Sequence, residues 1–154
     1  MAFNVFISYS TVDLPVVNQI KGILESNSTE VFVAEYSVGA GQVLSSQIET
    51  AIKNCNLFIL IWSKNSKASD WVPQEIGIAK ASQRQILPII LEPNLQLPGF
   101  IADLKHLPIY KSPQESMAWL RNNVFGKAKE KEQNDGLFWL GLGVVVMLLA
   151  ASKK

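Results

Sequence analysis

Five short apolar runs, separated by longer segments, constrain the fold of this chain more than any other feature. The runs are rich in aromatic and β-branched residues, and they are Phe3–Ser8, Val31–Ala34, Leu57–Trp62, Ile86–Leu91 and a weaker Leu107–Tyr110. Several of them are apolar at successive positions, which is typical of strands buried on both faces of a parallel sheet. Each run therefore predicts one strand of such a sheet.

The segments between these runs carry helix signals. Asp13 is a predicted N-cap, and apolar residues then recur at helical spacing as far as Leu24. Further helices are predicted around Ile48, from near Ser69, and from Ser112 with its following proline. Repeated strand–helix alternation predicts an α/β fold of the flavodoxin-like kind, with a doubly wound, parallel, five-stranded sheet flanked by helices.

A long uncharged stretch, Gly136 to Ser152, follows this domain. As a helix its 17 residues would extend about 25 Å, close to the shortest span of a hydrocarbon core of about 30 Å. Basic residues precede it, and the positive-inside tendency then favours a cytoplasmic domain. We predict a C-terminal hydrophobic helix that crosses the cell membrane once; packing on its own domain or in an oligomer is the alternative.

The chain thus divides into a domain at 1–126, a polar segment at 127–135 and the predicted transmembrane helix at 136–152. The polar segment is either a linker or a solvated helix extension. Lys and Arg total 14 against 13 Asp and Glu, so a broad basic surface for nucleic acid is excluded. With one cysteine, Cys55, and one histidine, His106, the chain cannot build a zinc site of soft ligands, and no metal is predicted.

One pair of residues near the predicted carboxyl ends of the strands, where ligands bind in open parallel sheets, could carry chemistry. Trp71 and Glu75 are four apart at the start of a predicted helix, so they share one face. An aromatic ring beside a single carboxylate suits a planar group and a cation that develops on a sugar ring. The structural alternative has Trp71 as a core anchor and Glu75 as an ordinary acid near a helix N-terminus.

Three motifs in this order resemble the TIR (Toll/interleukin-1 receptor) domain family, over about residues 3–125. They are Val5–Ser10 with Asp13 following, Val31–Val33 with Gly41, Ile48 and Ala51-Ile52 following, and Leu57–Ser63 with a Ser-x-Trp-x-x-x-Glu signature from Ser69 to Glu75. The Trp-x-x-x-Glu form resembles bacterial and archaeal enzymes of the family. The resemblance implies the same α/β fold that the apolar runs predict.

The resemblance also implies an activity. Enzymatic members cleave the nicotinamide–ribose bond of NAD⁺, which is a substrate here and not a cofactor, and they release nicotinamide with ADP-ribose or a cyclic ADP-ribose isomer. Glu75 would be the catalytic carboxylate that stabilises an oxocarbenium-like transition state. The substrate-binding residues implied by the resemblance are Tyr9, Ser10, Ser37, Gly41 and Trp71.

Self-association is the last property that the resemblance implies. In this family the BB loop, here Ser37 to Val43, docks on a neighbouring domain and completes the site. A membrane anchor would favour that contact by raising the local concentration. We therefore predict an NAD-consuming effector that clustering activates, and the family resemblance implies a role in prokaryotic immune or antiphage defence. The alternatives are a non-enzymatic adaptor acting through homotypic TIR–TIR contacts, and a signalling cyclase whose product activates a separate effector.

Overall fold

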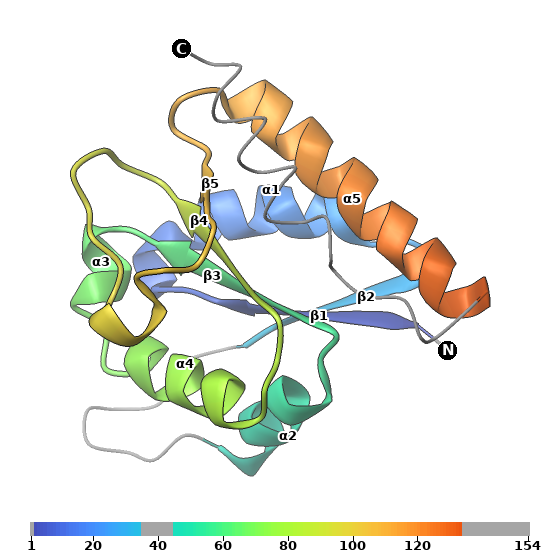
Figure 1. Cartoon of the computed structure of the whole chain (residues 1–154), viewed down its shortest axis with the longest axis horizontal. Helices are drawn as coiled ribbons and strands as arrows, with labels where there is room; N and C mark the ends of the chain where they lie inside the picture. The colour runs from blue at the N-terminus through green and yellow to red at the C-terminus, as the bar shows by residue number, and fades with distance from the viewer. Residues whose placement is uncertain (1, 35–44, 134–154) are drawn as a thin grey trace.

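The computed structural model describes residues 2–34 and 45–133, which form a parallel sheet between two layers of helices (Figure 1). The strands are β1 (Phe3–Ser8), β2 (Thr29–Val33), β3 (Leu57–Trp62), β4 (Ile86–Ile90) and β5 (Leu107–Pro108). They pair in the order β2-β1-β3-β4-β5, and every pair is parallel. This is the flavodoxin-like order, so the predicted fold class and its five strands are confirmed.

Helices make most of the connections. They are η1 (Thr11–Asp13), α1 (Leu14–Leu24), α2 (Ser46–Asn54), α3 (Lys64–Lys67), α4 (Val72–Ala81), η2 (Gly99–Ile101) and α5 (Pro113–Gln133). The sequence did not predict α3, because four residues are too few to show an apolar period. It forms because the Ser63 hydroxyl oxygen accepts from the backbone N–H groups of Asn65 and Ser66, at 3.1 and 3.2 Å.

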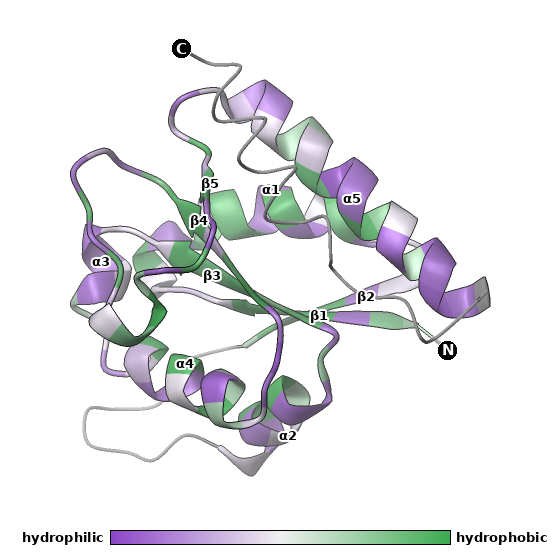
Figure 2. Ribbon diagram, viewed as in Figure 1, coloured by the Kyte–Doolittle hydropathy of each residue, from purple (hydrophilic) through white to green (hydrophobic). Residues whose placement is uncertain are grey.

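The strands supply two separate cores, since successive residues of a strand point to opposite faces of the sheet. On one face α1 and α5 cover Val5 and Ile7 of β1. On the other, α2 and α4 cover Phe6 and Phe58, whose rings stack with centroids 5.5 Å apart. Figure 2 shows that the strands are apolar along most of their length, whereas the helices carry both polar and apolar residues. Burial of both faces explains why the strand runs are apolar at successive positions.

The last helix, α5, continues through residues 127–133 of the predicted polar segment. The described part of that segment is therefore a helix extension and not a linker. It is also less solvated than expected, because Ala128 is buried against the core on the α1 face. The Ser28 hydroxyl, just before β2, donates to Glu132 Oε1 at 2.5 Å and ties the end of α5 to the domain.

Two predicted segments lie outside the described residues. One is the C-terminal hydrophobic helix at 136–152, and the other is the BB loop, Ser37 to Val43. Within residues 2–34 and 45–133, no helix combines the length and the apolar character needed to span a membrane.

Candidate active site at the carboxyl ends of the strands

Glu75, the predicted catalytic carboxylate, lies in the first turn of α4. This helix packs against α2 and β1 and turns Val72 and Ile76 inward, where both are fully buried. Glu75 belongs to the same inward face and has no exposed surface. A buried carboxylate destabilises the fold by several kcal/mol unless it accepts hydrogen bonds. Removing one partner of a buried ion pair, for example, costs about 3–5 kcal/mol. The contacts of Glu75 are therefore the centre of the site.

The Ser8 hydroxyl donates a hydrogen bond to Glu75 Oε1 at 2.5 Å. Ser8 is the last residue of β1 and is also fully buried. β1 lies between β2 and β3, where the strand order reverses, and ligands of flavodoxin-like sheets bind beyond the strand ends at the β1/β3 position. The structure thus holds the Glu75 carboxylate at the edge of the sheet where a ligand is expected.

Sequence reasoning did not select Ser8 as a site residue, although a signal exists. Ser8 follows the apolar residues Val5–Ile7 directly, and its position in a strand buried on both faces predicts a buried side chain. A buried polar group needs a partner, so an isolated serine there indicates a specific contact. The sequence could not identify the partner, because Glu75 lies 67 residues further along the chain.

Trp71 occupies the N-cap position of α4 and is half-buried. Its backbone N–H donates to the Ser69 hydroxyl at 3.1 Å, and its carbonyl accepts from the backbone N–H of Glu75 at 3.0 Å. Trp71 and Glu75 therefore lie one helical turn apart, as their spacing predicts. The helix begins at Val72, slightly later than the predicted start near Ser69.

Tyr9 lies on the other side of the sheet from Glu75. Its ring packs in the core beneath α1 and α5, and its hydroxyl donates to the carbonyl of Ala34 at 2.5 Å. The physical reason is the alternation of side chains along an extended chain, which sends Ser8 and Tyr9 to opposite faces. The structure does not bring the Tyr9 ring to the carboxylate, and a role for Tyr9 in substrate binding stays a prediction.

Ser10 is half-buried at the N-cap position of η1, and its carbonyl accepts from the backbone N–H of Asp13 at 2.8 Å. It therefore shapes the exit of β1, close in sequence to Ser8. The two remaining predicted substrate-binding residues, Ser37 and Gly41, lie outside the described residues.

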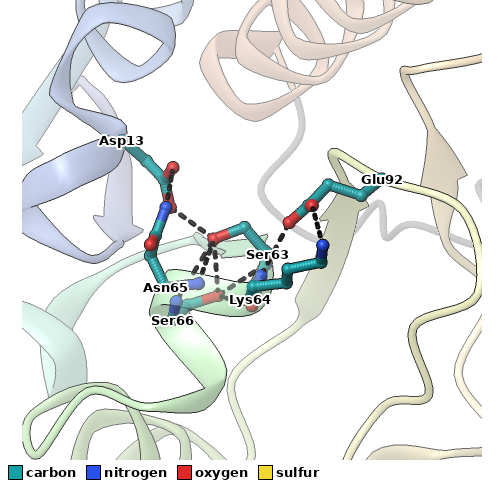
Figure 3. Close-up of polar contacts among 6 residues, drawn as sticks. All are labelled: Asp13, Ser63, Lys64, Asn65, Ser66 and Glu92. Atoms are coloured by element: carbon teal, nitrogen blue, oxygen red, sulfur yellow. Dashed lines mark hydrogen bonds and ion pairs between the residues drawn. The ribbon is translucent and has the colours of Figure 1, made fainter.

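Polar side chains join three connections at this edge of the sheet (Figure 3). Asp13 Oδ2 accepts from the Ser63 hydroxyl at 2.5 Å, and Asp13 Oδ1 accepts from Asn65 Nδ2 at 3.1 Å. From the β4 side, Glu92 Oε1 accepts from the backbone N–H of Lys64 at 2.7 Å. The segment that begins α3 is thus held from both the β1 and the β4 connections.

The predicted N-cap position of Asp13 is confirmed, but its side chain does not cap α1. Asp13 does occupy the N-cap position, and Pro15 follows in the first turn as predicted, but the carboxylate makes no capping hydrogen bond. Its φ of −92° and ψ of 12° lie outside the extended region that N-cap residues usually adopt. The carboxylate consequently turns to the connection after β3.

A cavity of about 290 Å³ adjoins this network beside β4, and it is lined in part by Glu92, His106 and Tyr110, but neither Glu75 nor Trp71 lines it. Burial raises the pKa of the Cys55 thiol to about 12, which the nearby Arg84 only partly offsets, so the thiol is protonated and unreactive at neutral pH. Within the described residues, no group of three or more His, Cys, Asp or Glu side chains could hold a metal ion.

The family model described as the TIR domain matches residues 5–121. This span covers well over half of the chain and contains both Ser8 and Glu75. The chain belongs to the TIR domain family. The resemblance carried by the three sequence motifs is therefore confirmed for this TIR domain.

Two solved structures are similar to this chain. The TIR domain of the Toll-related receptor TRR-2 from Hydra magnipapillata is 24% identical, with 81% of this chain and 97% of that chain covered and a TM-score of 0.63. The TIR domains of the activated Roq1 resistosome, which directly recognizes the pathogen effector XopQ, are 17% identical, with 88% and 75% coverage and a TM-score of 0.48. No curated protein matches this TIR domain. The likeness to the Hydra domain shows the fold of this chain.

Proposed function

We propose that this TIR domain is an NAD⁺ nucleosidase that cleaves the bond between nicotinamide and ribose. The observation that carries the proposal is the fully buried Glu75 carboxylate, held by Ser8 at the carboxyl edge of the sheet. Trp71 stands one helical turn before it. A carboxylate in a site shielded from water stabilises a developing positive charge far more strongly than one in solution.

Cleavage needs little else from the protein. As the glycosidic C–N bond breaks, its electron pair leaves with nicotinamide, whose ring becomes neutral, and the ribose gains oxocarbenium character. Glu75 stabilises that cation, while the Ser8 hydroxyl fixes the orientation of the carboxylate. Addition of water with loss of a proton gives ADP-ribose, and attack by the adenine of the same molecule gives a cyclic isomer instead. NAD⁺ is the substrate, and no cofactor takes part.

The burial of Glu75 has a consequence for regulation. A side chain without exposed surface cannot contact a ribose, so the carboxylate must be uncovered before turnover. We propose that self-association through the BB loop, Ser37 to Val43, supplies this change, which makes activity depend on clustering. We also propose a role in prokaryotic immune or antiphage defence, and the support is the resemblance of the Trp-x-x-x-Glu form at Trp71 and Glu75 to bacterial and archaeal enzymes of the family.

We also propose that residues 136–152 anchor the chain in the cell membrane, with the TIR domain in the cytoplasm. The support is an uncharged stretch of 17 residues with basic residues before it. Deleting residues 136–154 should move the protein from the membrane fraction to the supernatant. A shortened chain that still sediments with membranes would contradict the anchor.

The activity is tested with the full chain, dilute in detergent and clustered on vesicles, by following NAD⁺ loss and separating linear from cyclic products by chromatography. Glu75→Gln should lower turnover at least about 100-fold, because it removes the charge that stabilises the transition state. The matched control is Glu115→Gln, which neutralises an exposed carboxylate in the first turn of α5. This control should retain wild-type turnover.

Two outcomes would contradict the proposal. Undiminished turnover in Glu75→Gln would remove the role of this carboxylate. A wild-type chain that cleaves no NAD⁺ even when clustered, yet binds other TIR domains whether or not Glu75 is present, would identify an adaptor instead.

A further inference from the structure

Hydrogen bonds join the end of β1 and the residues just after it to the segment that contains α3 and α4. Their acceptors are two carboxylates far apart in sequence, Asp13 and Glu75. Ser8, at the end of β1, donates to Glu75 on α4. Five residues later, the Asp13 carboxylate accepts from Ser63 and Asn65, at the start of α3. The exit of β1 therefore holds this region at two points, one on the proposed catalytic carboxylate and one before it in the chain.

We infer that Asp13 is a positioning residue for Glu75, and this inference rests on the proposed nucleosidase function. Both Asp13 oxygens are committed to the connection after β3, at 2.5 Å to the Ser63 hydroxyl and 3.1 Å to Asn65 Nδ2. The carboxylate forgoes capping its own helix, although it stands at the N-cap position of α1. Its contacts therefore act on α3 and not on α1.

The contact at Asp13 reaches Glu75 through a short and continuous series of hydrogen bonds. The Ser63 oxygen that donates to Asp13 also accepts from the backbone N–H groups of Asn65 and Ser66, which fixes the first turn of α3. Ser69, which follows α3, donates its backbone N–H to the carbonyl of Ser66 at 3.1 Å, and its hydroxyl accepts from the backbone N–H of Trp71 at 3.1 Å. Trp71 in turn starts the helix that carries Glu75.

The opposite side of α3 is fixed as well. Glu92 Oε1 accepts from the backbone N–H of Lys64 at 2.7 Å, while the Lys64 ammonium lies 3.8 Å from Glu92 Oε2 (Figure 3). Removing Asp13 thus releases the hydrogen bonds that hold the start of α3 from the β1 side, while the Glu92 contact and the Ser8–Glu75 hydrogen bond stay in place. Because a shift of about 1 Å in a catalytic group can cost about 100-fold in rate, the loss should appear in turnover.

The test compares Asp13→Ala with Glu132→Ala in the full chain. Glu132 is the matched control, because it also accepts from a serine hydroxyl at 2.5 Å, but on α5. Asp13→Ala should lower kcat for NAD⁺ about 10- to 100-fold with KM within about twofold, since the carboxylate is displaced and not removed. Glu132→Ala should leave both constants unchanged.

Amide hydrogen exchange provides a readout that does not depend on turnover. Asp13→Ala should speed exchange at Trp71 and through the first turn of α4, and Glu132→Ala should not. If Asp13→Ala does not fold, Asn65→Ala removes one of the two hydrogen bonds to Asp13 and takes its place. Wild-type kcat in a folded Asp13→Ala or Asn65→Ala would overturn the inference. If the wild type cleaves no NAD⁺, the proposed function fails, and unchanged exchange in α4 would then overturn the positioning role as well.

Discussion

The buried hydrogen bond between Ser8 and Glu75 should contribute more to the free energy of unfolding than an exposed hydrogen bond of the same length. Both side chains are fully buried, and the donor–acceptor distance is 2.5 Å. A hydrogen bond to a charged group contributes about 1.5–3 kcal/mol, and removing its donor leaves a buried carboxylate less well satisfied. The coupling free energy between Ser8 and Glu75 should therefore lie in the range of about 1.5–3 kcal/mol.

A double-mutant cycle measures this coupling. The wild type, Ser8→Ala, Glu75→Ala and the double variant are unfolded with urea at 25 °C, and the coupling is the departure of the double variant from additivity. The chain contains its own control in Ser28 and Glu132, which form a hydrogen bond of the same 2.5 Å length at the surface. Solvent competes for that pair, so its coupling should stay below about 1 kcal/mol.

The comparison between the two cycles decides whether burial matters. A Ser8–Glu75 coupling below about 0.5 kcal/mol, or one equal to that of the surface pair, would refute the reasoning. It would mean that water or another donor replaces the Ser8 hydroxyl once the serine is removed. The cycle applies only if all four proteins have the same m-value, which is the slope of the unfolding free energy against urea concentration.

Two further predictions concern other parts of the domain. Gln83, just after α4, has a φ of 57°, and the N–H of Arg84 donates to the carbonyl of Ala79 at 2.9 Å, which is a Schellman ending that favours glycine. Gln83→Gly should stabilise the domain by about 0.5–1 kcal/mol in urea unfolding, whereas Ser82→Gly, at a φ of −87°, should destabilise it. Burial raises the pKa of Cys55 from 9.0 to about 12, so the unfolded chain loses this proton first and stability falls above pH 9 by about 1.4 kcal/mol per pH unit. Unfolding of Cys55→Ala between pH 8 and 10.5 should lack this slope, and equal slopes in both proteins would contradict the assignment.

The fold was largely predictable because its information is local. Strand runs such as Leu57–Trp62 are apolar at every position, since helices cover both faces of the sheet, and this pattern is visible without any partner. The four-residue helix α3 escaped prediction because it has no apolar period; its cap at Ser63 became evident only from the contacts. The helical course of residues 127–133 was one of two alternatives, and the burial of Ala128 explains why the helix continues.

The candidate site was predictable only in part. The spacing of Trp71 and Glu75 fixed their relation, because residues four apart on a helix are neighbours wherever the helix lies. That Ser8 donates to Glu75 was not predictable, because the two residues meet only when α4 packs against β1. Asp13 lies at the predicted N-cap position of α1, but the partners of its carboxylate were not predictable, since the same group can cap its own helix or bind another segment, and local sequence does not choose between them.

The sequence by itself therefore determined the fold class and the family, and it selected Glu75 as the candidate carboxylate, because all three depend on residue type and spacing along the chain. Tertiary structure alone decided that Glu75 is fully buried, that the Ser8 hydroxyl donates to it, and that the Asp13 carboxylate binds the start of α3. The physical reason is that hydrogen bonds between distant segments depend on which strands become neighbours in the sheet, since neighbouring strands bring the connections at their ends together. A parallel sheet brings together connections that are 50 or more residues apart, as between Asp13 and Ser63.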